Sequence, residues 1–427
     1  MQSLLICSDM HMDIEMANDL MSCTTDWTND YTCADTVIIM TCAFGIKKHY
    51  SMYVIADVLR NVKPGSRVIA TGCLTKINEN ELKAIPNLEV KSLEEVKTII
   101  GGKTSSSLKK NKIKQNTVII SNGCLKRCSY CAYSLIEKKY VSKPIENILE
   151  EVREIAKYES IIYITGAHET SDYGVDLYGK RKISELLNEI CIEFPKCKFV
   201  IGWFHPIGLT DSVIDTIATH SNIIQIMLHI QHNDNEILKS MNRPKFEVVE
   251  SKIQKLHLLR QDLSISTEVI VGFPGETEEK FNFLVKYLEE SRTLFQDIGV
   301  ACYEPVLNTK AALLPNLPDY AVRSKRMNII QNLFGATVYP APKDFTPLLS
   351  SYFEACFLLS KVPNICIKAD SRQLYPYIAG TDTEFKMNLA LNIQNFEFDT
   401  NMLQNIMECN EKFTPSFQKW LLQKFCK

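Results

Sequence analysis

Three cysteines, Cys124, Cys128 and Cys131, stand within the short segment SNGCLKRCSYC. The C-x3-C-x2-C spacing places three thiolates on one loop, directly after the apolar run TVIIS (117–121). A cubane iron–sulfur cluster is usually held by four cysteine thiolates, so three of them leave one iron open to a small molecule. Two other interpretations are a zinc site that lacks its fourth ligand and three unrelated buried cysteines. We expect the iron–sulfur cluster.

A second set of cysteines lies nearer the N-terminus. Cys7 ends the apolar run SLLIC, Cys42 follows the run TVIIMT, and Cys73 follows the run RVIATG. If these runs are parallel strands, their carboxyl ends share one edge of a sheet, which is where such sheets bind ligands. The three thiols could hold a second cluster with an open iron, or they could be buried structural cysteines.

The bulk composition is that of a globular protein. A length of 427 residues indicates two or three domains, and the net charge of −2 supplies no basic field that would draw nucleic acid. The 15 cysteines are scattered and odd in number, unlike a secreted disulfide framework. The N-terminus lacks the basic and apolar regions of a signal peptide, and no apolar run approaches the roughly 18–20 residues that span a bilayer. We therefore expect a cytoplasmic protein without membrane contact.

The order of apolar runs predicts an α/β fold in several parts. Residues 1–100 alternate short apolar runs with amphipathic stretches, which indicates βαβ units around a parallel sheet. Residues 101–116 lack apolar periodicity and are typical of a linker. Residues 117–334 contain six runs separated by helical patterns, fewer than the eight of a closed barrel. We expect this central domain to be a (β/α)6 partial TIM barrel.

The final segment, residues 335–427, differs from the rest. It predicts a small α+β module with strands at 364–369 and 387–394. We expect this module to recognise the substrate.

Three further segments end predicted strands of the central domain. They are TGAHETSDYG (165–174), LHIQHNDNEILKSMNR (228–243) and TEVIVGFPGETEE (267–279). The carboxyl ends of barrel strands form the active site, and Gly272 would let the backbone approach a ligand closely. Each segment is a weak signal alone.

Together, these features resemble the radical S-adenosylmethionine (SAM) methylthiotransferases, from about residue 3 to residue 330. The cysteine triplet, with Tyr130 before its third member, is similar to the cluster motif of that family. Further matches are the C-x5-D-x-E pattern of Cys7, Asp13 and Glu15, the runs QHNDNEIL (231–238) and VGFPGET (271–277), and YEPVLNTKAA (303–312).

The resemblance implies SAM and two [4Fe–4S] clusters as cofactors, one on each set of three cysteines. One electron from a low-potential cluster cleaves SAM to a radical that takes hydrogen from an unactivated carbon. The N-terminal cluster carries or supplies sulfur, which another SAM methylates, and the substrate radical captures the methylthio group. The resemblance also implies an electron donor such as flavodoxin or ferredoxin. No strong acid or base is needed, so we expect no catalytic side chain beyond the cofactors.

Positions at predicted strand ends suggest which residues contact SAM. We expect Tyr130 to pack near the adenine. The other candidates are Gly166, His168, Gln231, Glu268 and Gly272.

The sequence leaves the substrate open. Residues 335–427 do not resemble the compact β domain with which the family recognises transfer RNA or a ribosomal protein, and their nine basic and nine acidic residues leave them neutral. We expect a peptide, protein or small-molecule substrate. The alternatives are a transfer-RNA methylthiotransferase and an enzyme that inserts sulfur without a methyl group. An iron–sulfur electron-transfer protein is disfavoured, because open irons invite ligands.

Overall fold

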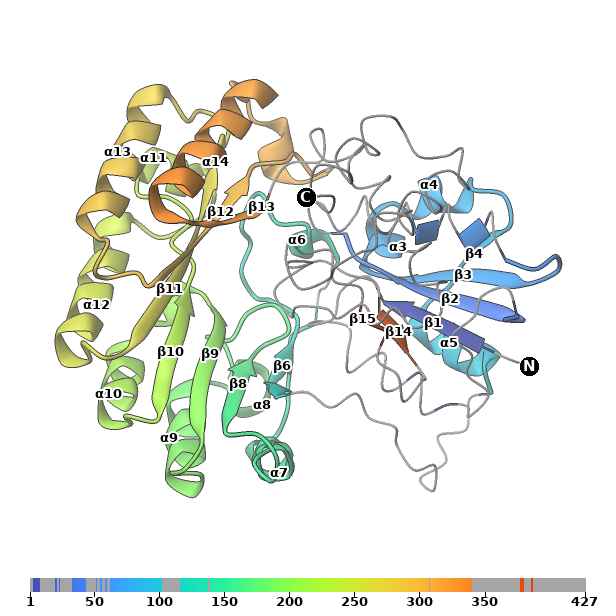
Figure 1. Ribbon diagram of the computed structural model, residues 1–427, viewed down its shortest axis with the longest axis horizontal. Helices are drawn as coiled ribbons and strands as arrows, with labels where there is room; N and C mark the ends of the chain where they lie inside the picture. The colour runs from blue at the N-terminus through green and yellow to red at the C-terminus, as the bar shows by residue number, and fades with distance from the viewer. Residues whose placement is uncertain are drawn as a thin grey trace, which may run out of the picture. The chain divides into compact units, whose positions relative to one another are not determined.

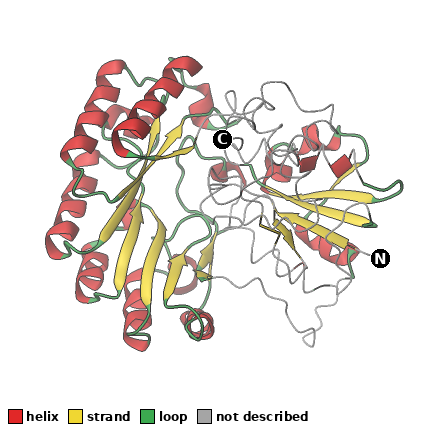
Figure 2. Ribbon diagram, in the orientation of Figure 1, coloured by secondary structure: helices red, strands yellow, loops and turns green. Residues whose placement is uncertain are grey.

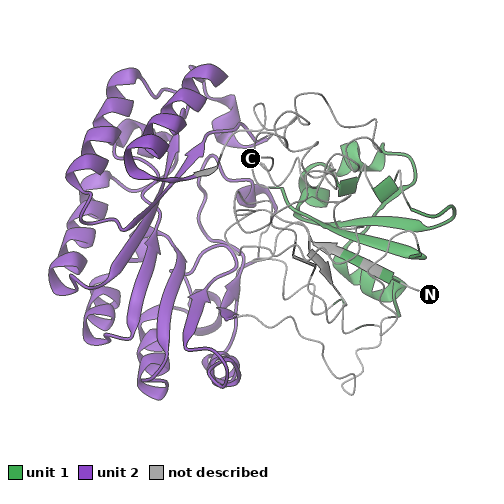
Figure 3. Cartoon of the chain, viewed as in Figure 1, with its two compact units in different colours: residues 1–113, 342–427 green, residues 114–341 purple. Residues whose placement is uncertain are grey.

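The protein was analysed as a computed structural model (Figure 1), which describes residues 3–7, 20, 23, 33–43, 51, 54–55, 58–59, 62–101, 116–136, 139–306, 308–339, 377–379 and 385–386. The chain divides into two compact units (Figure 3). Unit 1 comprises residues 1–113 and 342–427, and unit 2 comprises residues 114–341.

Unit 2 is built on a seven-stranded sheet in the order β13-β12-β11-β10-β9-β8-β5, with every neighbouring pair parallel. Its strands are β5 (Thr117–Ile119), β8 (Ile161–Thr165), β9 (Lys198–Phe204), β10 (Ile223–Leu228), β11 (Ser264–Val271), β12 (Asp297–Cys302) and β13 (Thr337–Tyr339). The first six coincide with the six predicted strands, and β13 adds a seventh at the edge. The predicted α/β partial barrel is confirmed.

Helices fill the connections of this sheet, and the long ones line its outer side in Figures 1 and 2. They are α6 (Tyr133–Ile136), α7 (Ile145–Ile155), α8 (Val175–Tyr178), α9 (Ile183–Glu193), η1 (Pro206–Gly208), α10 (Asp211–Thr219), α11 (Asn235–Ser240), α12 (Phe246–Leu259), α13 (Glu278–Glu290), η2 (Lys310–Leu313) and α14 (Tyr320–Phe334).

The sequence of each element explains its place. In β11, SISTEVIV, six of eight residues are buried, as expected for a parallel strand covered on both faces. In α13 the buried residues are Phe281, Leu284, Tyr287 and Leu288, which repeat at helical spacing. Thr277 begins this helix, because its side chain accepts a hydrogen bond from the N–H of Lys280. These apolar faces meet in the core between sheet and helices.

Unit 1 contains a six-stranded sheet in the order β15-β14-β1-β2-β3-β4. Its strands are β1 (Ser3–Cys7), β2 (Thr36–Thr41), β3 (Arg67–Gly72), β4 (Leu88–Val90), β14 (Tyr377–Ala379) and β15 (Phe385–Lys386). The first four run parallel, as the sequence predicts. Its described helices are α3 (Cys73–Ile77), α4 (Glu79–Lys83) and α5 (Leu93–Ile99).

The C-terminal segment contributes to this sheet. Strand β14 pairs antiparallel with β1, and β15 pairs antiparallel with β14. The strands expected at 364–369 and 387–394 lie outside the described residues, so a separate module over 335–427 stays a prediction.

No helix in the part of the chain that the structure describes is long and apolar enough to span a membrane.

Candidate active site

The first set of cysteines lies on a loop closed by a short hairpin. Strand β6 (Ser121–Asn122) follows β5 and pairs with β7 (Val141–Ser142). The chain between them carries Cys124, Cys128 and Cys131, and we call residues 123–132 the cysteine loop. Gly123 begins it with φ of 92°, and a Cβ there would lie 2.5 Å from the carbonyl oxygen of Lys139. At position 123, the first residue of the loop, any side chain would therefore clash with the backbone, so the position requires glycine.

The end of α11 holds the cysteine loop in place. Ser129 donates from its backbone N–H to the carbonyl of Met241 at 3.0 Å, and from its hydroxyl to the carbonyl of Ser240 at 2.6 Å. Asn242 donates from its amide to the carbonyl of Arg127 at 2.9 Å. We call Ser240, Met241, Asn242 and Arg243 the anchor segment. It joins two parts of the chain more than 100 residues apart, with sequence separations of 111 and 115 for two of these bonds.

Arg243 is the residue of the anchor segment that reaches a sulfur atom. Its Nη1 lies 3.9 Å from the Sγ of Cys128, and its Nη2 donates to the carbonyl of His229 at the end of β10. Among the described residues, no carboxylate forms an ion pair with Arg243. Its positive charge is therefore directed mainly at the cysteine loop.

Burial favours the neutral thiol at two of the three cysteines, because it raises the pKa of Cys124 and of Cys131. It raises the pKa of Cys124 to about 12. It also raises the pKa of Cys131 to about 11, with a further contribution from the charge of Cys128. A bound metal centre deprotonates such thiols outright, so loading a cluster here would release protons.

A buried ion pair ties the same loop to the segment that follows β8. Lys126 lies 2.7 Å from a carboxylate oxygen of Asp172, and Arg181 lies 2.9 Å from the other oxygen. Only 3% of the Asp172 side chain is exposed. The neighbouring Glu169 accepts hydrogen bonds from two backbone N–H groups of that segment, and its burial raises its pKa.

This arrangement fits an iron–sulfur cluster better than a zinc ion. Within the described residues, no three His, Cys, Asp or Glu side chains gather closely enough to hold a single metal ion. Zinc needs its ligands around one point, whereas the cysteines of a cubane each bind a different iron. Three thiols on a fixed loop, beside one cation that lacks a carboxylate partner, suit a cluster of net negative charge.

Tyr130 packs into a small apolar cluster beside the cysteine loop. The cluster contains Ile237, Met241, Ile270, Phe273, Tyr303 and Ala311. The rings of Phe273 and Tyr303 meet edge to face with centroids 4.9 Å apart. This cluster joins the segments that follow β11 and β12 to the cysteine loop.

Four of the other predicted SAM contacts, Gly166, His168, Gln231 and Gly272, follow the carboxyl ends of strands, whereas Glu268 lies within β11. Gly166 follows β8, and the Nδ1 atom of His168 accepts a hydrogen bond from the N–H of Gly123 at 3.3 Å. Gln231 is buried with φ of 68°, and its backbone bridges to β11 through the carbonyl of Glu268 at 2.9 Å. The side-chain Oε1 of Gln231 has no hydrogen-bond partner among the described residues. A buried orphan acceptor calls for an additional donor.

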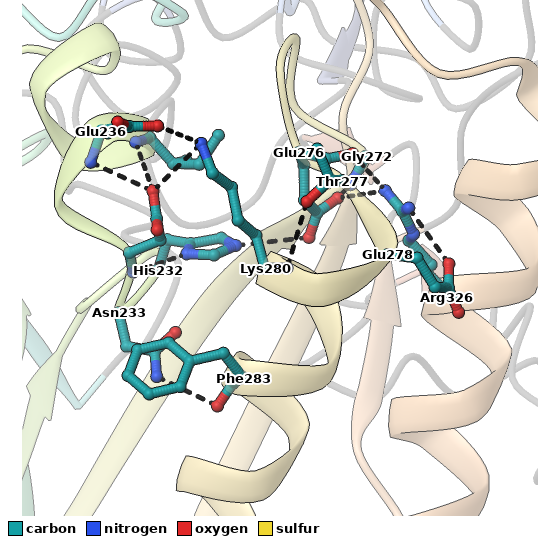
Figure 4. A network of polar contacts seen from close by, with 12 residues as sticks. His232, Asn233, Glu236, Gly272, Glu276, Thr277, Glu278, Lys280, Phe283 and Arg326 are labelled. Carbon is teal, nitrogen blue, oxygen red and sulfur yellow. Dashed lines mark hydrogen bonds and ion pairs between the residues drawn. The ribbon is translucent and has the colours of Figure 1, made fainter.

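Gly272 is held by a buried polar network, drawn in Figure 4. Glu276 accepts a hydrogen bond from the N–H of Gly272 and two from Arg326, one at its carboxylate and one at its backbone carbonyl, both at 2.9 Å. The imidazole of His232 contacts the second carboxylate oxygen of Glu276. The network fixes the loop after β11 against α14 and against the segment that follows β10.

The N-terminal cysteines lie at the carboxyl edge of the unit 1 sheet. Cys7 is the last residue of β1, Cys42 follows β2 and is buried, and Cys73 follows β3. Thr41 of β2 is paired with Gly72 of β3, so the next residues, Cys42 and Cys73, occupy equivalent positions on the two neighbouring strands. Cys7 of β1 is paired with Met40 of β2. The side chain of Cys7 is outside the described part of the structure.

Comparison with known proteins identifies the family. The model of the radical SAM superfamily matches residues 118–288. The chain is 32% identical to the ribosomal protein uS12 methylthiotransferase RimO of Clostridium acetobutylicum, over 75% of this chain and 78% of that protein. It is also 32% identical to the RimO protein of Alkaliphilus oremlandii, over 70% of this chain and 73% of that protein. The chain belongs to the radical SAM methylthiotransferase family.

Similarity to solved structures is weaker. The radical SAM methyltransferase TsrM of Kitasatospora setae has a TM-score of 0.48 and 13% identity, over 66% of this chain and 64% of that one. Such a similarity supports no functional conclusion. As a radical SAM methylthiotransferase, this chain is a transferase that uses SAM and [4Fe–4S] chemistry.

Several residues of the candidate active site were missed by the sequence analysis. The contacts of three of these residues join segments that are far apart in the sequence, so the sequence alone does not show them. The residues are Lys126, Asp172 and Arg243. Arg243 lies three residues after the end of α11, and nothing in its spacing from the cysteines predicts that it contacts them. Trp203 was missed as well: it has φ of 46° at the end of β9, and its ring meets that of His229 edge to face. Positive φ is unusual for a bulky residue and is concentrated at functional sites.

Proposed function

We propose that this methylthiotransferase modifies a carbon atom of a protein or peptide substrate. The support is its similarity to several RimO proteins, each named for methylthiolation of ribosomal protein uS12. The candidate active site has no basic run that would track a nucleic-acid backbone in its described residues, since Lys126 and Arg181 share the carboxylate of Asp172. A protein of the uS12 type is the first substrate to test.

We further propose that Cys124, Cys128 and Cys131 hold one [4Fe–4S] cluster. The observation that carries this proposal is the fixed position of the cysteine loop, held through Ser129 and Arg127 by the anchor segment. The loop lies at the carboxyl ends of the barrel strands, where (β/α) barrels place their chemistry. SAM and the cluster supply the radical chemistry. The residues of the chain hold, orient and shield these groups.

The proposed SAM-binding residues are Tyr130, Gly166, His168, Gln231, Glu268 and Gly272. In this proposal Tyr130 and its apolar cluster receive the adenine ring. The buried Oε1 of Gln231 accepts a hydrogen bond from SAM, which would satisfy its missing partner. Glu268 stands beside Gln231, to which it is bonded through the backbone.

A second cluster on Cys7, Cys42 and Cys73 is proposed as the carrier or source of the sulfur. The parallel register of β1, β2 and β3 supports it, because it brings these three positions to one edge of the sheet. A low-potential donor such as flavodoxin or ferredoxin would supply electrons.

The substrate class can be tested by mass spectrometry. The reconstituted enzyme, SAM and dithionite are incubated without oxygen with purified uS12 of Clostridium acetobutylicum or, separately, with its bulk transfer RNA. We expect uS12 to gain a methylthio group in place of one hydrogen. Modification of RNA alone would replace the proposal with the transfer-RNA alternative. Sulfur without methyl on uS12 would instead indicate a sulfur-inserting enzyme, and no change in either substrate would exclude the uS12-type substrate.

A further inference from the structure

We propose that the hydroxyl group of Thr71 donates a hydrogen bond to a sulfur atom of the proposed N-terminal cluster and so helps the protein to retain that cluster. The inference rests on the proposed function, because it requires a cluster on Cys7, Cys42 and Cys73. It deepens that proposal by assigning a contact with the cluster to a side chain that is not a cysteine.

Thr71 lies in the row of the unit 1 sheet that contains Cys7. Met40 of β2 is paired with Cys7 of β1 on one side and with Thr71 of β3 on the other. Along the chain, Thr71 stands two residues before Cys73, and Met40 stands two residues before Cys42. Thr71 is therefore at the edge of the sheet to which the register brings the three cysteines.

The hydroxyl of Thr71 is buried without a partner in the described part of the chain. Only 1% of the residue is exposed, and its Oγ1 atom forms no hydrogen bond with any described residue. A buried hydroxyl without a partner costs free energy, and such groups are few in folded proteins. The missing partner of Thr71 indicates that an additional group binds at this edge of the sheet.

Local movement does not supply the partner, because the chain around Thr71 is fixed. The hydroxyl of Thr41 donates to the carbonyl of Thr71 at 2.7 Å, and the hydroxyl of Thr75 donates to the carbonyl of Gly72 at 2.7 Å. Gly72 has φ of 98° and lies so close to Thr41 that a Cβ would be 2.6 Å from its carbonyl oxygen. These contacts hold the chain between Thr71 and Cys73 in one conformation.

An ordered water is the alternative partner, and the surroundings of Thr71 disfavour it. A buried water usually makes about three hydrogen bonds. Met40, which is paired with Thr71, and Ile69, two residues before Thr71 in β3, both belong to an apolar core of unit 1. The neighbouring hydroxyl of Thr41 already donates to a carbonyl. A cluster sulfur, by contrast, needs only the one hydrogen bond that Thr71 can donate.

Thr71→Val should affect the metal-free and the loaded protein in opposite directions. Val keeps the branched shape of Thr and lacks the hydroxyl. In the metal-free protein, loss of an unpaired buried hydroxyl should raise the urea midpoint or leave it unchanged. In the loaded protein, loss of a hydrogen bond to the cluster should make iron release about tenfold faster, because outer contacts of metal sites contribute on this scale.

Two other hydroxyls of the same sheet provide matched controls. Ser3, the first residue of β1, is also 1% exposed and lacks a partner among the residues that the structure describes, but it lies four residues before Cys7. Ser3→Ala should therefore leave iron release unchanged. Thr41 makes a hydrogen bond, so Thr41→Val should lower the urea midpoint of the metal-free protein.

The experiment follows the transfer of iron to the chelator bathophenanthroline without oxygen. The parent is the full chain with Cys124, Cys128 and Cys131 changed to Ala, which leaves the proposed N-terminal cluster alone. Thr71→Val, Thr71→Ser, Ser3→Ala and Thr41→Val are each reconstituted in this background, and urea unfolding of the metal-free proteins is followed by circular dichroism. We expect Thr71→Val to release iron about tenfold faster than the parent. Thr71→Ser, which keeps the hydroxyl, should match the parent.

The outcomes separate the inference from the proposed function. If Thr71→Val releases iron at the parent rate, or if Ser3→Ala releases it as fast as Thr71→Val, the contact assigned to Thr71 is wrong. If Thr71→Val lowers the urea midpoint as much as Thr41→Val, the hydroxyl has a structural partner such as water, and the inference is also wrong. If Thr71→Val loads no cluster although Thr71→Ser does, with an unchanged midpoint, the contact is supported. If the parent loads no cluster, the proposed N-terminal cluster itself fails, and the contact fails with it.

Discussion

The Nε2 atom of His232 lies 3.3 Å from a carboxylate oxygen of Glu276, and neither side chain is exposed to solvent. The second oxygen of Glu276 accepts from Arg326, of which 5% is exposed. Figure 4 shows these side chains converging from three segments of unit 2. The loop that carries Gly272 is therefore fixed by buried charge.

Breaking this network should cost much more stability than breaking a surface ion pair. Arg326→Met leaves the buried Glu276 without its cation, which we expect to lower the free energy of unfolding by about 3–5 kcal/mol. The control is Arg153→Met, because Arg153 pairs with Glu193 at the surface with 53% of its side chain exposed. Its expected cost is about 0–1 kcal/mol. Urea unfolding followed by circular dichroism measures both, and equal costs would contradict the buried role.

Gly72 should be needed for the proposed N-terminal cluster. It has φ of 98°, and a Cβ there would lie 2.6 Å from the carbonyl oxygen of Thr41. Gly72→Ala should distort the end of β3 beside Cys73, so that iron falls from about eight to about four atoms per chain after reconstitution.

Gly65 provides the comparison for this substitution. It also has positive φ, 87°, but a Cβ there would meet no atom within 4 Å. Gly65→Ala should cost about 1 kcal/mol from backbone strain and keep the full iron content. Equal iron content in the two variants would show that the end of β3 does not shape a cluster site.

Lys126 should restrain the cysteine loop before any cluster is bound. Lys126→Met removes the ion pair at 2.7 Å with the buried Asp172, which keeps Arg181 as a partner. We expect amide hydrogen exchange in residues 123–132 of the metal-free protein to become about tenfold faster. Lys157→Met, which breaks an exposed pair with Glu154, should leave that exchange unchanged. A loop that exchanges at the same rate in both variants would contradict the restraint.

Glu89 should make a small contribution to stability that depends on pH. The hydrogen bond from Arg67 lowers the pKa of Glu89 below its ordinary value of 4.5. A lowered folded-state pKa means that the unfolded chain binds the proton more tightly, so this stability is present above about pH 4.5 and is lost as the pH falls through the folded pKa. Because both side chains are more than a third exposed, the contribution should be below about 1 kcal/mol.

The test compares unfolding of the parent and Glu89→Gln between about pH 3 and pH 7. The two curves should differ at neutral pH and converge in acid. A constant difference across that range would show that the Arg67 contact does not act through the charge of Glu89.

Much of the fold followed from local patterns. The runs at 3–7, 36–41, 67–72 and 198–204 became strands with the same bounds, because short, mainly apolar runs between polar stretches suit buried parallel strands. Strand β13 was missed, since its three residues are too few for a pattern. The pairing of β14 with β1 was missed as well, because it joins segments far apart in sequence.

In the candidate active site, too, features of single residues could be predicted from the sequence, whereas contacts between distant segments could not. The cysteines and glycines could be named from spacing, because their chemistry and backbone freedom are properties of single residues. The anchor segment, the Lys126–Asp172 pair and the Arg326–Glu276 pair depend on distances between segments, which one sequence does not encode locally. The contacts of Arg243 illustrate this, since its partners Cys128 and His229 precede it by 115 and 14 residues.

The proposed cluster on the N-terminal cysteines should carry sulfur that SAM methylates. The direct measurement needs no substrate: the reconstituted full chain is mixed with methyl-labelled SAM and no reductant, quenched in acid, and assayed for labelled methanethiol. We expect methanethiol from the parent and from a Cys124, Cys128 and Cys131 to Ala variant, but none from a Cys7, Cys42 and Cys73 to Ala variant. No methanethiol from a parent that has loaded both clusters, or an undiminished yield without the N-terminal cysteines, would contradict the claim.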